Sequence, residues 1–141
     1  LTFLLLRDHT GLYRISLLCC LLHEGGHLAV YILRLKKVPR LHCSLWGICL
    51  GWNEMELGPQ ERFWVAASGP LTNLTLFAVF WLWMQYSASY WGWYFAGSNL
   101  LTAGYNLLPI LPLDGGQMIA AWRDGKTRKK ENCNSSANTV Q

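Results

Sequence analysis

Charged residues are unusually scarce in this sequence. They make up 14% of the 141 residues, whereas a typical soluble domain has about 25%. From Phe63 to Leu113 there is no Asp, Glu, Lys, Arg or His, a stretch of 51 residues. A segment of that length can hold two membrane spans of about 20 residues each and a turn. The composition therefore argues against an ordinary soluble domain and predicts a membrane protein.

The sequence also lacks the cysteine pattern of a disulfide-stabilised protein. It has five cysteines, an odd number, and Cys19 and Cys20 are adjacent within an apolar run. Reduced thiols that pack as small apolar groups are the better prediction. Cys43 and Cys49 are a weak candidate for a zinc-binding pair, because their separation is not a usual ligand spacing.

Three apolar segments have about the length of membrane spans. They cover residues 12–35, 60–85 and 91–108, and residues 41–57 between the first two have the turn signals of an extended or hairpin segment. The predicted fold class is an all-α membrane protein with three transmembrane helices and this short extended insertion. Pro70 is expected to break or bend the second span.

The last part of the chain is predicted to be partly structured. Pro109 and Pro112 end the third span, and a short helix is expected over residues 117–122. Residues 1–122 then form the membrane-embedded core. Residues 123–141 are basic and then rich in Asn and Ser, which predicts a disordered tail.

The positive residues predict the orientation in the membrane. Three spans place the loop after the first span and the tail on the same side, and nine lysines and arginines lie there against two near the start of the chain. Positive charge marks the cytoplasmic side. The chain is therefore expected to be a multi-pass protein of the cell membrane, with its tail and the entrance to its site on the cytoplasmic side.

A candidate metal-binding motif lies in the first span, where residues 23–27 read His-Glu-Gly-Gly-His. On a helix, His23 and His27 share one face and can bind one metal ion. Glu24 lies about 100° further round, close enough to reach a water on that metal. The alternative is a pair of histidines that only form hydrogen bonds within a core. This is disfavoured because polar groups at membrane depth cost free energy and are usually functional.

A catalytic zinc site usually has a third protein ligand. Asp114 is one candidate, because it ends the charge-free stretch; its alternative interpretation is a surface turn with Gly115. A soluble enzyme of the thermolysin kind would instead use a glutamate. The glutamates at suitable positions are Glu54, Glu56 and Glu61.

Three blocks of the sequence resemble, in order, the signature motifs of the site-2 protease family, which are intramembrane zinc metalloproteases. The blocks are residues 23–27, residues 68–73 (Ser-Gly-Pro-Leu-Thr-Asn) and residues 106–116 (Asn-Leu-Leu-Pro-Ile-Leu-Pro-Leu-Asp-Gly-Gly). The last block is most similar to family members of spore-forming bacteria. The resemblance covers residues 12–122, although a residue bulkier than Gly25 is more usual in the first block.

The resemblance implies that Asp114 joins His23 and His27 as the third zinc ligand. Glu24 would accept a proton from the zinc-bound water and pass it to the leaving amine. The expected substrate is another membrane protein, cut within or near a transmembrane segment.

Two asparagines are candidates for substrate binding, because unwound backbone in a membrane needs hydrogen-bond partners. The amides of Asn73 and Asn106 can each donate and accept. The alternative for either is a hydrogen bond between helices.

Two other functions remain open on the sequence. A catalytically silent relative would keep the metal site and bind membrane proteins, which the intact Glu24 disfavours. A metal carrier would need more ionisable groups along the spans. The partners expected are a membrane-protein substrate and the lipid bilayer. The tail lacks aromatic residues between its basic ones, so no nucleic-acid partner is expected.

Overall fold

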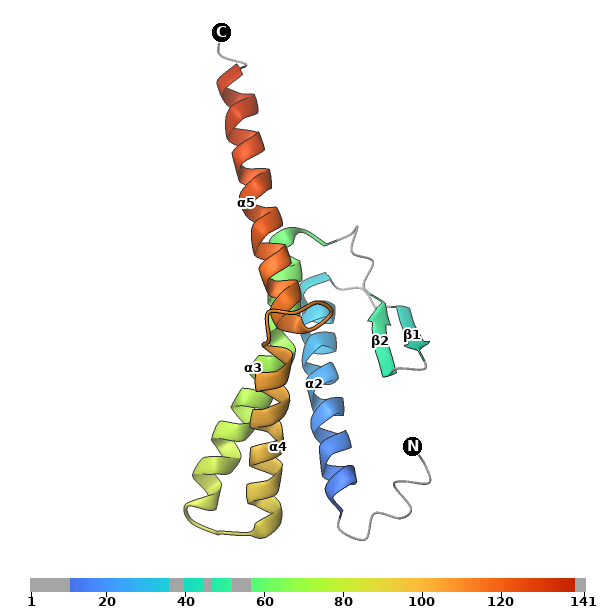
Figure 1. The fold of residues 1–141 in the computed structure, drawn as a ribbon, viewed down its shortest axis with the longest axis vertical. Coiled ribbons are helices and arrows are strands. Elements are labelled where there is room, and N and C mark those ends of the chain that lie inside the picture. The colour runs from blue at the N-terminus through green and yellow to red at the C-terminus, as the bar shows by residue number, and fades with distance from the viewer. Residues whose placement is uncertain (1–10, 36–39, 45–46, 52–56, 139–141) are drawn as a thin grey trace.

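A computed structural model describes residues 11–35, 40–44, 47–51 and 57–138 (Figure 1). Three helices run alternately up and down, and a fourth continues beyond them (Figure 1). The helices are α2 (Leu12–Leu35), α3 (Pro59–Met84), α4 (Tyr90–Asn106) and α5 (Asp114–Asn138), and the strands are β1 (Arg40–Ser44) and β2 (Gly47–Gly51). The first three helices match the predicted spans to within two residues at each end.

Helix α3 is the centre of the bundle, because it packs against α2, α4 and α5. Pro59 occupies its first turn, where a missing N–H does no harm, and the Glu61 carboxylate accepts a hydrogen bond from Gly58 N at 3.0 Å. Of the predicted break or bend at Pro70, the break is absent, since α3 is one continuous helix from Pro59 to Met84. Pro70 is fully buried, and packing on several sides of α3 offsets the hydrogen bond that proline removes.

Helices α3 and α4 form a hairpin at the lower end of the bundle (Figure 1). Ser89 caps α4 by accepting a hydrogen bond from Gly92 N at 3.1 Å. The rings of Phe80 and Phe95 pack across the hairpin with centroids 4.5 Å apart. The 17 residues of α4 measure about 25 Å along the axis, somewhat less than the apolar thickness of a bilayer, so its role as a third span stays a prediction.

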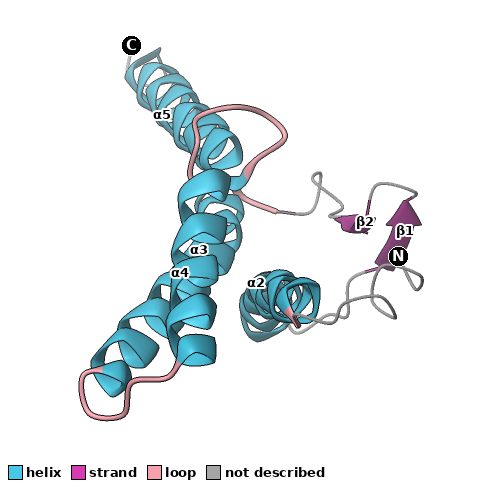
Figure 2. Cartoon of the chain, turned by 60° about the horizontal axis from the view of Figure 1, so that its bottom comes forward, coloured by secondary structure: helices cyan, strands magenta, loops and turns pink. Residues whose placement is uncertain are grey.

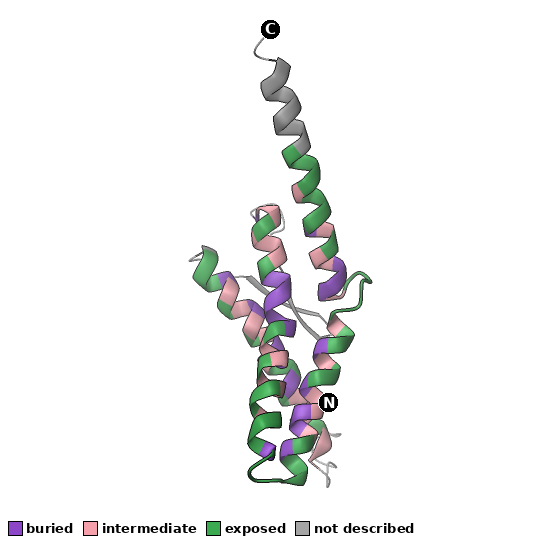
Figure 3. Cartoon of the chain, turned by 90° about the vertical axis from the view of Figure 1, so that its left-hand side faces the viewer, coloured by how far each residue is buried: buried purple, intermediate pink, exposed green. Residues whose placement is uncertain are grey.

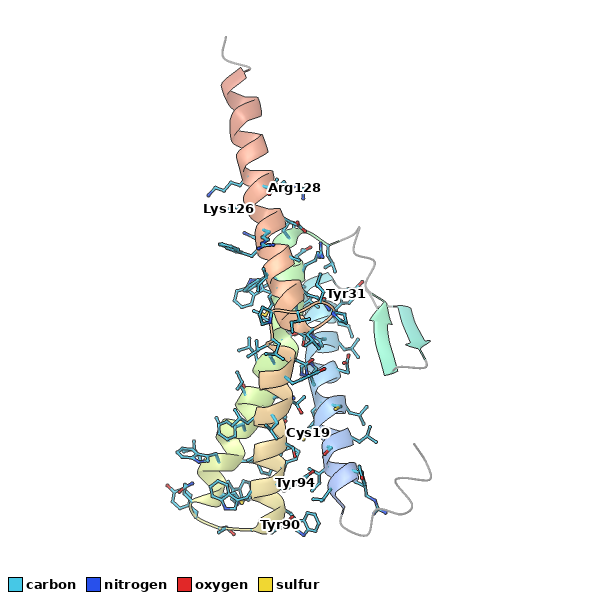
Figure 4. All side chains as sticks on the ribbon, viewed as in Figure 1. Cys19, Tyr31, Tyr90, Tyr94, Lys126 and Arg128 are labelled. Atoms are coloured by element: carbon cyan, nitrogen blue, oxygen red, sulfur yellow. The ribbon has the colours of Figure 1, made fainter. Side chains whose placement is uncertain are left out.

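Two polar contacts join α2 to α4, and both lie below the level of the bundle's centre. Ser16 Oγ and the Tyr94 hydroxyl are 3.2 Å apart, and Asn99 Nδ2 donates to Cys19 Sγ at 3.3 Å (Figure 4). Cys19 is buried, Cys20 is exposed, and both are free thiols, as predicted. The side chains of the other cysteines lie outside the described residues.

The strands β1 and β2 pair antiparallel, with Arg40 opposite Gly51 and Ser44 opposite Gly47. They fall within the segment predicted to be extended. The pair lies on the side of α2 that faces away from α3 and α4 (Figures 1 and 2).

Helix α5 differs from the sequence prediction. The pattern predicts a short helix over residues 117–122 and a disordered tail, whereas α5 is continuous from Asp114 to Asn138. No proline follows Pro112, and arginine and lysine are good helix formers. Over residues 122–129, the part beyond the bundle whose burial is described, this helix is largely exposed (Figure 3).

The outer surface of the bundle is apolar. Helices α2, over Leu12–Arg34, and α3 are each long and apolar enough to cross a membrane. Large apolar side chains point outwards from all three bundle helices, for example Leu33 with 76% of its surface exposed and Leu101 with 75%. Soluble proteins rarely expose contiguous apolar surface on this scale, so the exposed residues support a membrane protein.

Candidate metal centre

Three potential metal ligands meet in the interior, where the first turn of α5 reaches α2 and α3. His23 and His27 come from successive turns of α2, and Asp114 is the first residue of α5. Their exposed fractions are 4%, 5% and 8%. Asp114 is therefore buried, which excludes the alternative of a surface turn.

The distances between the three donor atoms suit a small metal ion. Asp114 Oδ2 lies 2.9 Å from His23 Nε2 and 3.3 Å from His27 Nε2, and the two Nε2 atoms are 3.2 Å apart. Tetrahedral zinc with bonds of about 2.0–2.1 Å holds its ligand atoms about 3.3 Å from one another. The three residues therefore match one face of a tetrahedral site, which leaves a fourth position for water or substrate.

Hydrogen bonding sets the tautomer of one histidine. His27 Nδ1 is 2.8 Å from the carbonyl oxygen of Val65, which can only accept, so Nδ1 carries the hydrogen. This leaves the lone pair of His27 Nε2 directed at the other two ligand atoms. Ser68 Oγ donates to the same carbonyl at 2.6 Å and thus lies beside the ring.

Two glycines allow α2 and α3 to approach each other at the site. A Cβ atom on Gly69 would collide with the rings of both histidines, and one on Gly26 would collide with Thr72 Oγ1. A Cβ on Gly25 would meet nothing within 4 Å. Gly69 had no role in the sequence interpretation, although it lies in the second of the three blocks. Its place between a serine and a proline was the available signal.

The loop before α5 explains how Asp114 reaches the histidines. A Cβ on Gly115 would collide with the carbonyl oxygen of Leu107, and one on Gly116 with the backbone of Ile110. The loop therefore folds back onto the first turn of α5, and only glycines fit beneath it. The packing of the loop on the two glycines thus holds the carboxylate of the preceding residue, Asp114, in the interior.

The electrostatics of Asp114, which follows the last predicted span, suit a ligand. Burial by itself would raise the pKa of this carboxyl group. The imidazoles of His23 and His27, which donate to the carboxylate and attract it when they are protonated, outweigh that effect and hold the pKa of Asp114 below its ordinary value. The group is thus ionised at neutral pH, as a metal ligand must be.

Glu24 lies at the edge of this cluster. It follows His23 on α2 and is partly exposed, whereas both histidines are buried. It is close enough to both imidazoles and to Asp114 to interact electrostatically with them. A carboxylate in this position is accessible to water and borders the ligands.

The other residues singled out in the sequence are not part of this three-residue cluster. Glu61 is bonded at the start of α3, outside the cluster, and Glu54 and Glu56 lie outside the described residues. Asn106 Nδ2 donates to Thr102 O within α4 at 3.0 Å. Asn73 is completely buried in α3. Substrate binding by either asparagine stays a prediction.

Apolar groups enclose the site from above. Tyr31, one turn after His27, packs in a buried cluster with Leu57 and Val65 (Figure 4). Val65 is also the residue whose carbonyl accepts the hydrogen bond from His27. The residue that holds His27 in place is therefore itself part of the apolar core.

Comparison with known proteins gives two similarities. The chain is 41% identical over 68 residues to a protein of Methanocaldococcus jannaschii named "Putative zinc metalloprotease", an alignment that covers 45% of the chain and 36% of that protein. It is 31% identical over 118 residues to Stage IV sporulation protein FB of Bacillus subtilis, which covers 82% of the chain and 41% of that protein. No protein-family profile matches the chain.

The chain thus spans about two fifths of the length of these curated relatives. The names agree with the resemblance of the three sequence blocks and with the metal-binding geometry. They support a relationship to the site-2 protease family of zinc metalloproteases.

Proposed function

We propose that this chain is the core of an intramembrane zinc metalloprotease of the site-2 protease type. The observation that carries the proposal is the buried triad of His23, His27 and Asp114, with donor atoms 2.9–3.3 Å apart and Glu24 beside it. Its membrane topology is multi-pass, with the tail on the cytoplasmic side. The excess of positive residues on that side supports this orientation.

The triad fits zinc chemically as well as geometrically. Two imidazoles and a carboxylate form a donor set that zinc enzymes use, and the fourth position stays open. Zinc bound there would supply an acidified water and polarise the scissile carbonyl group. His23 and His27 would remain neutral, and Asp114 would supply the one negative charge among the ligands.

Glu24 moves the proton in this proposal. Its carboxylate takes a proton from the attacking water and later delivers it to the nitrogen of the departing amine. Its partly exposed position allows water to reach the carboxylate. A protein that only bound metal or a partner would have no use for a base at this place.

The substrate is the transmembrane segment of another membrane protein, unwound near the cleavage point. Gly25 faces open space beside Glu24, so an extended backbone can approach there. The edges of the β1–β2 pair can add a further strand through main-chain hydrogen bonds. Asn106, partly buried near the end of α4, can accept a hydrogen bond at Oδ1 while its Nδ2 donates to Thr102 O.

The decisive experiment compares wild type with Glu24→Gln in detergent on a panel of single-span substrates, with the zinc content of each measured. Glu24→Gln should keep one zinc per chain and lose about 10²- to 10⁴-fold in cleavage rate, because the base is removed and the ligands remain. Chelation should stop cleavage by wild type, and added zinc should restore it.

Glu61→Gln is the matched control, since Glu61 is a partly exposed carboxylate that bonds only at the start of α3. It should keep both zinc and cleavage. Loss of zinc from this control would instead point to Glu61 as a ligand. Zinc in every variant with no cleavage by wild type would favour a silent, membrane-protein-binding relative, and no zinc in wild type would refute the site.

A further inference from the structure

Three polar atoms of two buried residues, one on α2 and one on α3, have no hydrogen-bond partner among the described residues. They are His23 Nδ1 and both amide atoms of Asn73, Oδ1 and Nδ2. Buried polar groups are nearly always paired, since an unpaired one loses its bonds to water and gains none in return. A ring nitrogen on α2 and an amide oxygen on the helix packed against it both lack a partner, which suggests that they serve each other in another state of the site.

The helix geometry places these atoms on the same side of His23. Gly69 faces the ring of His23, since a Cβ there would meet His23 Cε1, and Cε1 is bonded to Nδ1. Asn73 follows Gly69 by one helical turn and shares its face of α3. Helices α2 and α3 run in opposite directions (Figure 1). Moving from Gly69 to Asn73 along α3 is therefore a move in the same direction along the bundle as from His27 to His23 along α2.

The two histidine ligands are otherwise supported unequally. His27 Nδ1 has the carbonyl oxygen of Val65 at 2.8 Å, and His23 Nδ1 has no corresponding acceptor. Histidines that bind metals almost always donate their second ring N–H to an oxygen, which fixes the tautomer and the ring orientation. The site as described lacks that support for one of its two imidazoles.

We propose that Asn73 is the positioning residue of His23: its Oδ1 accepts the N–H of His23 Nδ1 when the metal is bound. This rests on the proposed zinc site and gives Asn73 a role different from the substrate binding predicted for it. The complete burial of Asn73 favours this role, because a substrate could touch its amide only after the helices separated.

The test measures zinc affinity by competition with a chelator, using the whole chain in detergent. Asn73→Leu keeps the approximate size of the side chain but removes the acceptor, and it should weaken zinc binding about 10- to 100-fold. Asn73→Asp keeps an acceptor and should bind zinc about as well as wild type. The visible spectrum of the cobalt-substituted protein should change in Asn73→Leu and return towards wild type in Asn73→Asp.

Asn99→Leu is the matched control. Asn99 is also fully buried, also has an unpartnered Oδ1, and lies on α4 with its Nδ2 bonded to Cys19 and Phe95. Replacing it should lower the unfolding temperature and leave zinc affinity unchanged. If Asn73→Leu does not fold, Asn73→Ala provides the same comparison.

Three results would overturn the role of Asn73 and leave the proposed function intact. One is wild-type zinc affinity with an unchanged cobalt spectrum in a folded Asn73→Leu. Another is an equal loss of affinity in Asn99→Leu, and the third is a failure of Asn73→Asp to retain zinc. If wild type itself binds no zinc, the proposed function fails first.

Discussion

Two glycines allow close contact between helices at two places in this bundle, the metal centre and the α3–α4 hairpin. Gly69 admits the imidazole rings of His23 and His27, and Gly92 on α4 admits the side chain of Met84 from α3. In both places a Cβ atom would collide with a side chain from a neighbouring helix. The difference lies in what packs against the glycine: two imidazole rings held by hydrogen bonds at the metal centre, and one flexible methionine side chain in the hairpin.

That difference separates a site from ordinary packing. A methionine has several rotatable bonds and can move to fill a changed space. The rings of His23 and His27 cannot move without disturbing donor distances of about 3 Å. The same kind of close contact should therefore be sensitive to substitution at the metal centre and tolerant in the hairpin.

The largest effect is expected for Gly69→Ala. The new methyl group would press on both imidazoles and force the ligands apart, so zinc affinity should fall by about tenfold or more, equivalent to about 1.4 kcal/mol or more. Chelator competition on the purified chain measures this loss directly.

Gly25→Ala is the control for that substitution, because it adds the same methyl group to the motif where nothing lies within 4 Å. It should keep its zinc and gain up to about 1 kcal/mol of helix stability. If Gly69→Ala binds zinc as tightly as Gly25→Ala does, Gly69 does not limit the position of the histidines.

A smaller and purely structural effect is expected for Gly92→Ala. The added methyl group displaces Met84, which should lower the free energy of unfolding by about 1–3 kcal/mol and leave zinc content unchanged. Thermal unfolding followed by circular dichroism gives the first quantity. The double variant Gly92→Ala/Met84→Ala should recover part of the loss, and a loss of zinc in either variant would contradict the contrast with Gly69.

The smallest effect is expected where α5 leaves the bundle. Arg62 Nη1 lies 3.2 Å from Asp124 Oδ2, with about half of the aspartate side chain exposed to solvent. Such pairs contribute about 0–1 kcal/mol. Asp124→Asn should therefore change the unfolding temperature little and zinc affinity not at all. A clear loss of zinc would show that this contact, and not the loop over Gly115 and Gly116, positions Asp114.

Some of this protein follows from local chemistry and can be predicted from sequence. The charge-free stretch and the apolar runs set the helices to within two residues of α2, α3 and α4. The spacing of His23 and His27 places them on one helix face whatever surrounds them. The cost of polar groups at membrane depth also favours a functional use of these residues.

Two predictions made from local sequence were wrong, one about a proline inside a helix and one about the tail. The break expected at Pro70 is absent, because helices pack along α3 on more than one side. The tail expected to be disordered continues α5 as far as Asn138. At Pro70 tertiary packing offsets the roughly 3 kcal/mol by which proline disfavours a helix interior, whereas in the tail the arginines and lysines are themselves good helix formers.

The sequence by itself determined the helices and the shared face of the two histidines, since helical periodicity alone places them. Only the tertiary structure shows that Asp114 reaches the histidines, because the backbone folded over Gly115 and Gly116 brings its Oδ2 to 2.9 Å from His23 Nε2 across 91 residues of chain. It also decided that Gly69 must lack a side chain, and that Asn73 is completely buried. These features depend on how two helices approach each other, and the pattern of residues along a single helix does not predict that approach.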